Sequence, residues 1–127
     1  MKSTEIRIGN YYNEFGIPKQ AHPNFILKLY QIELAGKIAV DVSPIPLTPE
    51  WLVLNGHSED NNGHFWINLQ THYLELITMP DGFYPIYAQL PEMSSEDEQR
   101  VGLNRINFIH EYQNLFFALT QTELEIK

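Results

Sequence analysis

The sequence predicts an α+β fold in which antiparallel strands pack with a short central helix and a longer C-terminal helix. Three observations indicate this class. Residues 107–120, NFIHEYQNLFFALT, carry apolar side chains at helical spacing. Residues 48–56 combine a helix-start signal with a helix-stop signal. Residues 57–90 contain short alternating runs separated by turn dipeptides, which is the pattern of a sheet.

Length and composition predict a single domain over residues 1–127. The chain is 43% hydrophobic and 13% aromatic, which excludes a disordered protein and indicates a core of large flat side chains. It has no cysteine, so disulfides, thiolate chemistry and zinc–sulfur sites are excluded. The first ten residues lack an apolar signal region, and no run is long enough to span a membrane. We expect a cytoplasmic protein that does not bind membranes.

The net charge is −8, from 16 acidic and 8 basic residues. Proteins that bind nucleic-acid phosphates cluster their lysines and arginines, whereas here no two basic residues are adjacent. We therefore expect no direct nucleic-acid binding. The acidity fits either simple solubility or an acidic surface that competes for a basic partner.

The N-terminal third predicts a small, strongly bent antiparallel sheet that is SH3-like. Residues 5–12 are expected to form a strand, residues 13–24 a long loop, and residues 25–34 a second strand by their alternation. A turn at Ala35-Gly36 then leads into a returning strand at residues 38–42.

The central helix is predicted from its end signals. Thr48 is a suitable N-cap, Pro49 fits the first helical position, and Asn55-Gly56 provides the stop. Residues 51–54, WLVL, make the helix apolar on every side. We expect it to be wedged between other elements.

A meander is predicted for the following segment. Asn62-Gly63 is a strong hairpin-turn dipeptide, and Pro80-Asp81-Gly82 is a second turn. Pro85 predicts an edge position for the last of the three strands. The expected strands are residues 65–69, 73–78 and 83–90. Residues 94–102 follow, where Ser95 and Glu98 have the spacing of a capping box at a helix start.

The C-terminal helix is predicted to begin at an Asn107 cap and to pack on the sheet through one dense stripe. On a helix, six apolar side chains share a face roughly 120° wide. These are Phe108, Ile109, Tyr112, Leu115, Phe116 and Leu119.

One large aromatic residue falls outside that stripe and gives the candidate binding site. Phe117 lies on the opposite side of the helix, where its neighbours are His110, Gln113 and Asn114. An aromatic ring among polar groups is either buried by a second layer, the outcome that we favour, or exposed as an anchor for a partner.

The known metal-binding and catalytic motifs are incomplete in this sequence, because required residues are missing at the required positions. His110-Glu111 begins an H-E-x-x-H motif, but Asn114 stands where the second histidine is needed. A calcium loop over residues 58–69 would have Ser58 and Leu69 at its first and last ligand positions, without carboxylates. There is no phosphate-binding glycine loop and no G-x-S-x-G elbow. We expect no metal, no cofactor and no enzyme activity.

Three histidines leave one alternative open. His57, His64 and His72 could approach one another at one end of a hairpin, with Glu59 and Asp60 nearby. Such a group could bind a metal or act as acid and base. Exposed histidines in loops are the interpretation that we favour.

Three segments stand out in combination and in order: RIGNYY at 7–12, PIPLTPEWL at 44–52, and INFIHEYQNLFFALTQTEL at 106–124. Together they resemble a family of small uncharacterised proteins encoded in prophages and mobile elements of Bacteroides-type gut bacteria. The family pattern is R-I-G-N, P-I-P-L-T-x-E-W-L and V-H-x-L-Q-N-L-Y-F-A-L-T. This chain departs from it at Ile109, Tyr112 and Gln121. The resemblance implies an origin in a phage or mobile element and implies no particular activity.

Two classes of function remain. The first is a non-catalytic accessory module that binds a protein, for which the aromatic content and the missing catalytic signatures argue. The second is an acidic mimic of nucleic acid that competes for a host DNA-binding protein, which needs carboxylates along one face.

Overall fold

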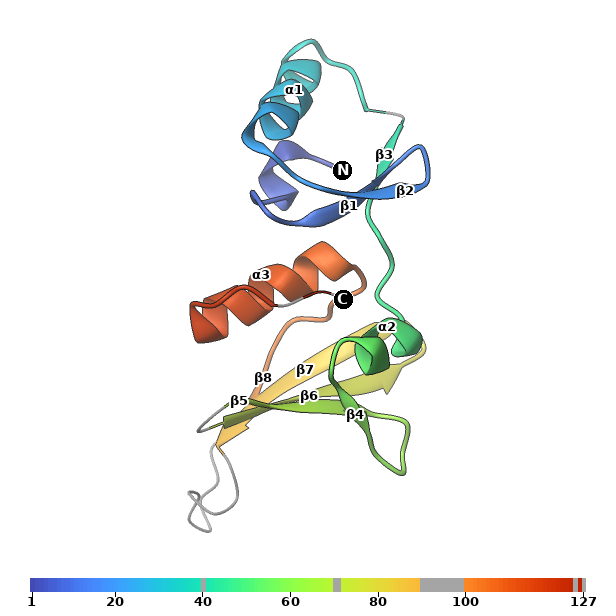
Figure 1. Ribbon diagram of the computed structural model, residues 1–127, viewed down its shortest axis with the longest axis vertical. Helices are drawn as coiled ribbons and strands as arrows, with labels where there is room; N and C mark the ends of the chain where they lie inside the picture. The colour runs from blue at the N-terminus through green and yellow to red at the C-terminus, as the bar shows by residue number, and fades with distance from the viewer. Residues whose placement is uncertain (40, 70–71, 90–99, 125, 127) are drawn as a thin grey trace. The chain divides into compact units, whose positions relative to one another are not determined.

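The computed structural model describes residues 1–39, 41–69, 72–89, 100–124 and 126, and it confirms the α+β class (Figure 1). The chain divides into two compact units. Unit 1 comprises Met1–Pro46 and Phe108–Leu124, and unit 2 comprises Leu47–Asn107 with the last three residues. The single domain over residues 1–127 stays a prediction. Among the described helices, none has the length and apolar character that a membrane crossing needs.

Unit 1 combines a three-stranded antiparallel sheet with two helices. The sheet has the order β2-β1-β3, so that β1 is central. The elements are a 3-10 turn η1 (Ser3–Glu5), β1 (Tyr11–Glu14), β2 (Ile17–Gln20), α1 (Pro23–Leu34), β3 (Val42–Ser43) and α3 (Ile109–Thr120).

The prediction of a strand over residues 25–34 is wrong, because this segment is most of helix α1. Pro23, which the sequence analysis placed in a loop, lies in the first helical turn, where its fixed φ suits the helix and its missing N–H costs nothing. The segment PNFILKLYQIEL is apolar at most positions, so an alternating pattern and a helical pattern coexist in it. With a helix in its place, the N-terminal part is not an SH3-like sheet of strands.

The expected loop at residues 13–24 contains a tight β-hairpin instead. Strands β1 and β2 pair from Tyr11↔Gln20 to Glu14↔Ile17 and leave only Phe15 and Gly16 in the turn. Both turn residues have positive φ, 52° and 77°, as a type I′ turn requires. The predicted strand over residues 5–12 is also interrupted, because Gly9 takes a φ of 93° and β1 begins only at Tyr11.

The core of unit 1 joins this hairpin to α1. Its buried residues come from the N-terminal segment, β1, the link between β2 and α1, and the middle of α1: Ile6, Tyr12, Ala21 and Leu29. The Tyr12 ring stacks on Phe25 with 4.0 Å between ring centroids and 12° between ring planes. The expected strand at residues 38–42 is reduced to the two residues of β3, beside which Ala39 packs on the core.

The Phe15→Asn substitution is expected to stabilise the fold by about 1 kcal/mol. A left-handed backbone costs an ordinary L-residue roughly 1–2 kcal/mol, whereas asparagine tolerates it and is favoured before glycine in this turn. The Phe15 side chain is 73% exposed, so little burial is lost. Urea unfolding of wild type, Phe15→Asn and Phe15→Ala measures the effect. Phe15→Ala keeps the strain and should unfold like wild type; a loss of stability in Phe15→Asn would contradict the argument.

Unit 2 is an antiparallel meander preceded by a short helix, as predicted. The five strands in its described residues lie in the sheet in chain order. The elements are α2 (Pro49–Leu54), β4 (Ser58–Glu59), β5 (Phe65–Leu69), β6 (His72–Met79), β7 (Gly82–Gln89) and β8 (Arg100–Gly102). One sheet face buries the alternate residues Phe65, Leu74, Leu76 and Phe83.

The predicted cap of α2 is confirmed, but the predicted wedging is wrong. The Thr48 hydroxyl accepts a hydrogen bond from the Trp51 backbone N–H at 3.2 Å. Leu52 is fully buried, whereas Val53 and Leu54 are 54% and 62% exposed. The six-residue helix thus buries one side only.

Pro85 does not mark an edge strand, because β7 lies between β6 and β8. In a strand, the N and C=O of one residue point to the same side, and the Pro85 carbonyl accepts a hydrogen bond from Leu103 N–H at 2.9 Å. The missing N–H therefore faces β8, and the residues of β7 that pair with β8 are Ile86 to Ala88, which do not include Pro85. The hydrogen bonds between β7 and β6 are thus unaffected by the proline. The predicted helix start at Ser95 and Glu98 lies outside the described residues.

Candidate functional site

Helix α3 is buried on two sides, one of which the sequence pattern missed. Ile109, Tyr112 and Phe116 of the predicted apolar stripe are buried. His110 and Gln113, which the sequence placed on the polar side, are buried as well. The helix begins one residue later than expected: Phe108 is the N-cap in place of Asn107, and its N–H donates to the Glu111 carboxylate at 3.0 Å.

Gln113, a predicted binding residue, is used for hydrogen bonds within unit 1. It is 2% exposed. Its side-chain oxygen accepts from the Tyr11 backbone N–H at 2.8 Å, and its side-chain nitrogen donates to the Gly9 carbonyl at 3.2 Å. The Tyr11 N–H lies at the start of β1, where it would otherwise need water, whereas the Gly9 carbonyl also accepts from Gln20 Nε2 at 3.2 Å. Gln113 thus fixes the N-terminal segment against α3.

Asn114, another predicted binding residue, completes the same network. Its side-chain oxygen accepts from Asn10 Nδ2 at 2.9 Å and from Arg7 Nε at 3.1 Å. Asn10 is fully buried, and its own side-chain oxygen accepts from the Arg7 backbone N–H at 2.6 Å. We call Arg7, Asn10, Gln113 and Asn114 the α3 clasp.

Phe117 is half-buried beneath the arginine of the α3 clasp. The Arg7 guanidinium lies over the aromatic ring, 4.5 Å from its centroid, and forms an ion pair with Glu123. A cation over an aromatic face is attracted by the ring's quadrupole. Phe117 is therefore neither fully buried nor freely exposed. Its ring is partly covered by Arg7, which belongs to the same unit.

His110, the fourth predicted binding residue, is 4% exposed and stacks on Phe108 with 5.9 Å between ring centroids. Its Nδ1 atom has no hydrogen-bond partner among the described residues. The structure therefore brings Phe117, Gln113 and Asn114 into contact with residues 7–11, and it packs His110 separately beside the helix start. Sequence reasoning could not detect the α3 clasp, because its two halves are separated by about a hundred positions.

The three histidines of unit 2 do not form a cluster. His57 is buried, and its Nδ1 lies 3.1 Å from the Leu52 carbonyl. His64 precedes β5 and accepts a hydrogen bond from Thr78 N–H at 3.0 Å, whereas His72 pairs with the far end of β5. Within the described ranges, no group of three or more histidines and acids is placed to hold a metal ion.

Lowering the pH from 7.5 to 5.5 is expected to reduce the free energy of unfolding. Burial lowers the pKa of His57 and of His110 below the ordinary value near 6.5. Between that value and the lower pKa values of the folded state, the unfolded chain binds more protons than the folded chain. The free energy of unfolding therefore falls as the pH drops below about 6.5, and the histidines cost no stability above that pH. Urea unfolding at several pH values measures the slope.

Two variants locate the source of this pH dependence. His110→Phe removes one buried imidazole and should flatten the slope. Gln31→Ala changes an exposed residue that does not titrate and should leave the pH dependence as in wild type. An unchanged slope in His110→Phe would count against the role assigned to His110.

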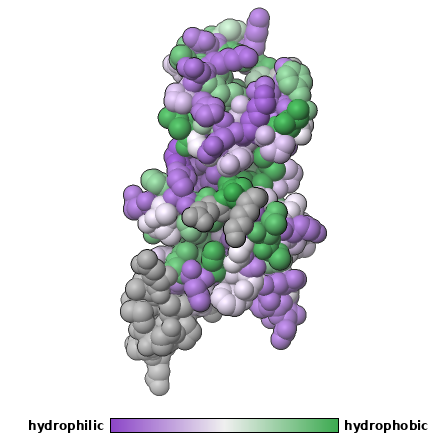
Figure 2. Space-filling view, viewed as in Figure 1, coloured by the Kyte–Doolittle hydropathy of each residue, from purple (hydrophilic) through white to green (hydrophobic). Residues whose placement is uncertain are grey.

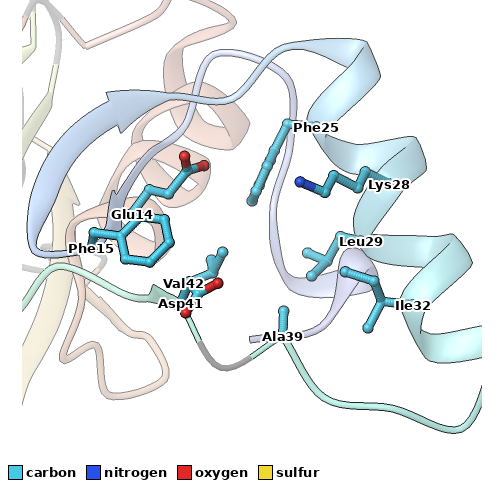
Figure 3. A pocket seen from close by; sticks show the side chains of 9 residues that line it. All are labelled: Glu14, Phe15, Phe25, Lys28, Leu29, Ile32, Ala39, Asp41 and Val42. Atoms are coloured by element: carbon cyan, nitrogen blue, oxygen red, sulfur yellow. The ribbon is translucent and has the colours of Figure 1, made fainter.

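A pocket of about 190 Å³ lies between the tip of the β1–β2 hairpin and α1 (Figure 3). Figure 3 shows α1 side chains across the pocket from the hairpin and from the segment that leads into β3. The apolar lining is Phe25, Leu29, Ile32, Ala39 and Val42.

Charged groups of both signs border this pocket, and an aromatic residue stands at its edge. Glu14 and Asp41 lie on the hairpin side and Lys28 lies on α1. Glu14 also forms an ion pair with Lys19 at 3.1 Å. Phe15 is the exposed turn residue with the left-handed backbone, and its N–H donates to the Asp41 carbonyl at 2.9 Å. The pocket thus offers an apolar floor, a charged rim and an exposed ring.

Exposed apolar side chains are a general feature of this molecule. Figure 2 shows hydrophobic residues at the surface, interspersed with hydrophilic ones. In unit 1 the most exposed of them are Ile38, Phe15 and Leu34, at 81%, 73% and 70%. Single exposed apolar residues are normal, whereas groups of them indicate contact surfaces.

Comparison of the chain with models of protein families, with curated proteins and with solved structures finds no match. The resemblance carried by residues 7–12, 44–52 and 106–124 therefore stays an expectation from the sequence. The α3 clasp gives parts of two of these segments a physical role, since RIGN at 7–10 and QN at 113–114 are hydrogen-bonded to each other.

Proposed function

We propose that this protein is a non-catalytic accessory module of a phage or mobile element, and that it binds a protein partner through the pocket beside Phe15. The occupant is a partner segment with one large apolar side chain flanked by charged residues. The observation that carries the proposal is Phe15 itself: a bulky residue in a left-handed turn, largely exposed, at the edge of an apolar pocket.

The unfavourable backbone conformation of Phe15 supports its role as a contact residue. A large aromatic residue at positive φ costs stability, and the exposed side chain regains little of that cost by burial. An asparagine or glycine would suit the turn better. A residue that is unfavourable for folding and exposed for contact fits a role in recognition, where aromatic anchors contribute much of the binding energy.

The lining of the pocket indicates the chemistry of the partner segment. Its apolar floor favours a hydrocarbon side chain. The Asp41 carboxylate favours a basic neighbour in the partner segment on the hairpin side, and Lys28 favours an acidic neighbour on the α1 side.

Affinity capture from lysate of the bacterial host, with and without phage infection, tests the proposal. The immobilised baits are the wild-type protein and two variants, Val53→Ala and Phe15→Asn. Wild type and Val53→Ala, which trims an exposed apolar side chain in unit 2, should retain the same protein. Phe15→Asn should lose it while folding at least as stably as wild type. The captured protein is then purified, and its affinity for the three baits is measured by calorimetry.

Two results would overturn this assignment. A captured protein that binds Phe15→Asn as tightly as wild type removes the pocket from the interface. A specific enzymatic turnover by the purified chain removes the non-catalytic class. For a hot-spot aromatic we expect a loss of roughly 2 kcal/mol or more, about 30-fold in affinity.

The alternative, an acidic mimic of nucleic acid, is supported by the net charge of −8 alone. Mimicry needs carboxylates that are free to replace phosphates along one face. Several acidic groups are instead held in ion pairs: Glu14 with Lys19, Asp81 with Arg105, and Glu123 with Arg7.

A further inference from the structure

Two asparagines of unit 2 are followed by the same residues but have different surroundings in the fold. Asn55 and Asn62 each precede Gly-His, in the segments LNGH at 54–57 and NNGH at 61–64. In an unfolded chain the two sites therefore have nearly the same local chemistry. Any difference in reactivity between them in the folded protein comes from the structure.

An asparagine that precedes a glycine can lose its side-chain amide without an enzyme. The backbone nitrogen of the glycine attacks the side-chain carbonyl carbon of the asparagine, and a five-membered succinimide ring forms. The amide nitrogen leaves as ammonia and takes up the proton of the glycine N–H. Water then opens the ring at either carbonyl, which gives aspartate or isoaspartate. Glycine favours the attack, because it has no Cβ and adopts backbone conformations that other residues avoid.

Asn62 has the freedom that this reaction needs. It lies at an exposed position between β4 and β5, and its side chain makes no hydrogen bond to another described residue. The Gly63 N–H donates to the Asp60 carbonyl at 3.2 Å, which is the long end of the range for such bonds. Apart from its chain neighbours, no atom lies within 4 Å of the place that a Cβ on Gly63 would take. The attacking nitrogen is thus weakly held and uncrowded.

Asn55 lacks this freedom. It is the C-cap of α2 and is 5% exposed. Its side-chain nitrogen donates to the Trp51 carbonyl at 2.9 Å, and its backbone N–H donates to the same carbonyl at 3.0 Å. Its own carbonyl lies 3.2 Å from Nδ1 of the buried His57. The amide can therefore turn toward Gly56 only when the end of α2 opens.

A third pair, Asp81-Gly82, can form the same ring but is protected in another way. The Asp81 carboxylate accepts hydrogen bonds from the Tyr84 hydroxyl at 2.8 Å and from Arg105 at 2.9 Å. These bonds lower the pKa of Asp81, and an ionised carboxylate resists attack by a nitrogen nucleophile. The backbone there is also crowded, since a Cβ on Gly82 would lie 2.1 Å from the Asn107 side-chain amide.

We propose that Asn62 is a site of spontaneous deamidation in the folded protein, and that the fold protects Asn55. The reaction consumes water and releases ammonia, and no other reactant is needed. It adds one negative charge to a loop that already contains Glu59 and Asp60.

The isoaspartate product also changes the backbone of this loop. Its main chain runs through the side-chain carbon and is one atom longer. The added atom falls inside a turn that is tied to β6, because the Thr78 hydroxyl donates to the Gly63 carbonyl at 2.7 Å and the Thr78 N–H donates to His64 Nδ1 at 3.0 Å. Deamidation thus modifies the connection between β4 and β5.

Ageing of the full chain, followed by peptide mass spectrometry, tests the proposal. The protein is held at mildly alkaline pH, folded in one sample and unfolded by urea in another. Cleavage after Glu59 at mildly acidic pH separates the two sites, and each peptide is examined for the mass gain of deamidation. In the folded sample Asn62 should react at least about tenfold faster than Asn55, which reacts only through local opening. In urea the two should react at similar rates.

Asn62→Gln is the matched control, because a glutamine needs a six-membered ring, which forms much more slowly. This variant changes an exposed side chain, so it should fold like wild type. It should lose the fast mass gain and leave the reaction of Asn55 unchanged.

Two results would overturn the proposal. Equal rates at Asn55 and Asn62 in the folded sample would show that the fold does not distinguish them. An Asn62 that stays intact in the folded sample but reacts in urea would show that the loop holds the amide away from Gly63. Both outcomes are independent of the pocket at Phe15, which belongs to unit 1.

Discussion

Phe65→Ala is expected to lower the free energy of unfolding by about 3–5 kcal/mol, enough to unfold much of unit 2 at room temperature. Phe65 is 2% exposed and meets Phe83 edge-to-face, with 6.4 Å between ring centroids and 68° between ring planes. Removing the ring loses its burial, leaves a cavity among close-packed neighbours, and deletes the aromatic contact. Chemical unfolding followed by near-ultraviolet circular dichroism measures the loss.

Trp66→Ala is the matched control for this prediction. Trp66 is adjacent in β5 but points to the opposite sheet face, where it is 36% exposed. Although the deleted side chain is larger, its loss should cost clearly less than that of Phe65. If the two substitutions lower the free energy of unfolding equally, the buried face of the meander does not contribute more to stability than the exposed face.

Gln113→Ala is expected to cost about 1–3 kcal/mol, a large effect for a polar residue. The substitution removes the acceptor of the Tyr11 N–H, whereas the Gly9 carbonyl keeps its hydrogen bond from the Gln20 side chain. An unsatisfied buried polar group costs roughly 1–3 kcal/mol, and one is created here. Hydrogen exchange at the Tyr11 amide should accelerate together with the loss of stability in urea.

Gln31→Ala is the control for Gln113, because it removes an exposed glutamine from α1 and should change stability by less than about 0.5 kcal/mol. If Gln113→Ala also falls within that range, water replaces the amide at no cost. In that case the α3 clasp would be a consequence of the fold rather than a cause of it.

Local signals in the sequence predicted the elements whose chemistry is complete within a few residues. The α2 cap needs only Thr48 and the backbone three residues later, and the meander needs only turn dipeptides between alternating strands. Helix α1 was missed for the opposite reason. Apolar side chains fill most positions of the segment, so an alternating pattern was present as well, and tertiary burial of Leu29 and Phe25 decides for the helix.

The candidate site was less predictable than the fold. A helical wheel identifies Gln113 and Asn114 as polar, but it does not show that residues 7–11 lie against them. Similarly, Phe15 was hidden in a segment expected to be loop. Its significance depends on its positive φ and on the pocket beside it, which are properties of the folded chain.

The order of the segments along the chain has a consequence for synthesis. Unit 2 is inserted within unit 1, and its ends are joined by a hydrogen bond of 2.8 Å from Leu47 N–H to the Asn107 carbonyl. A ribosome releases all of residues 47–107 before it completes α3, so unit 2 can fold while half of the α3 clasp is still missing. Once folded, unit 2 holds Pro46 and Phe108 near each other. It thereby shortens the loop that residues 7–11 must close to reach α3, and the entropic cost of that closure falls.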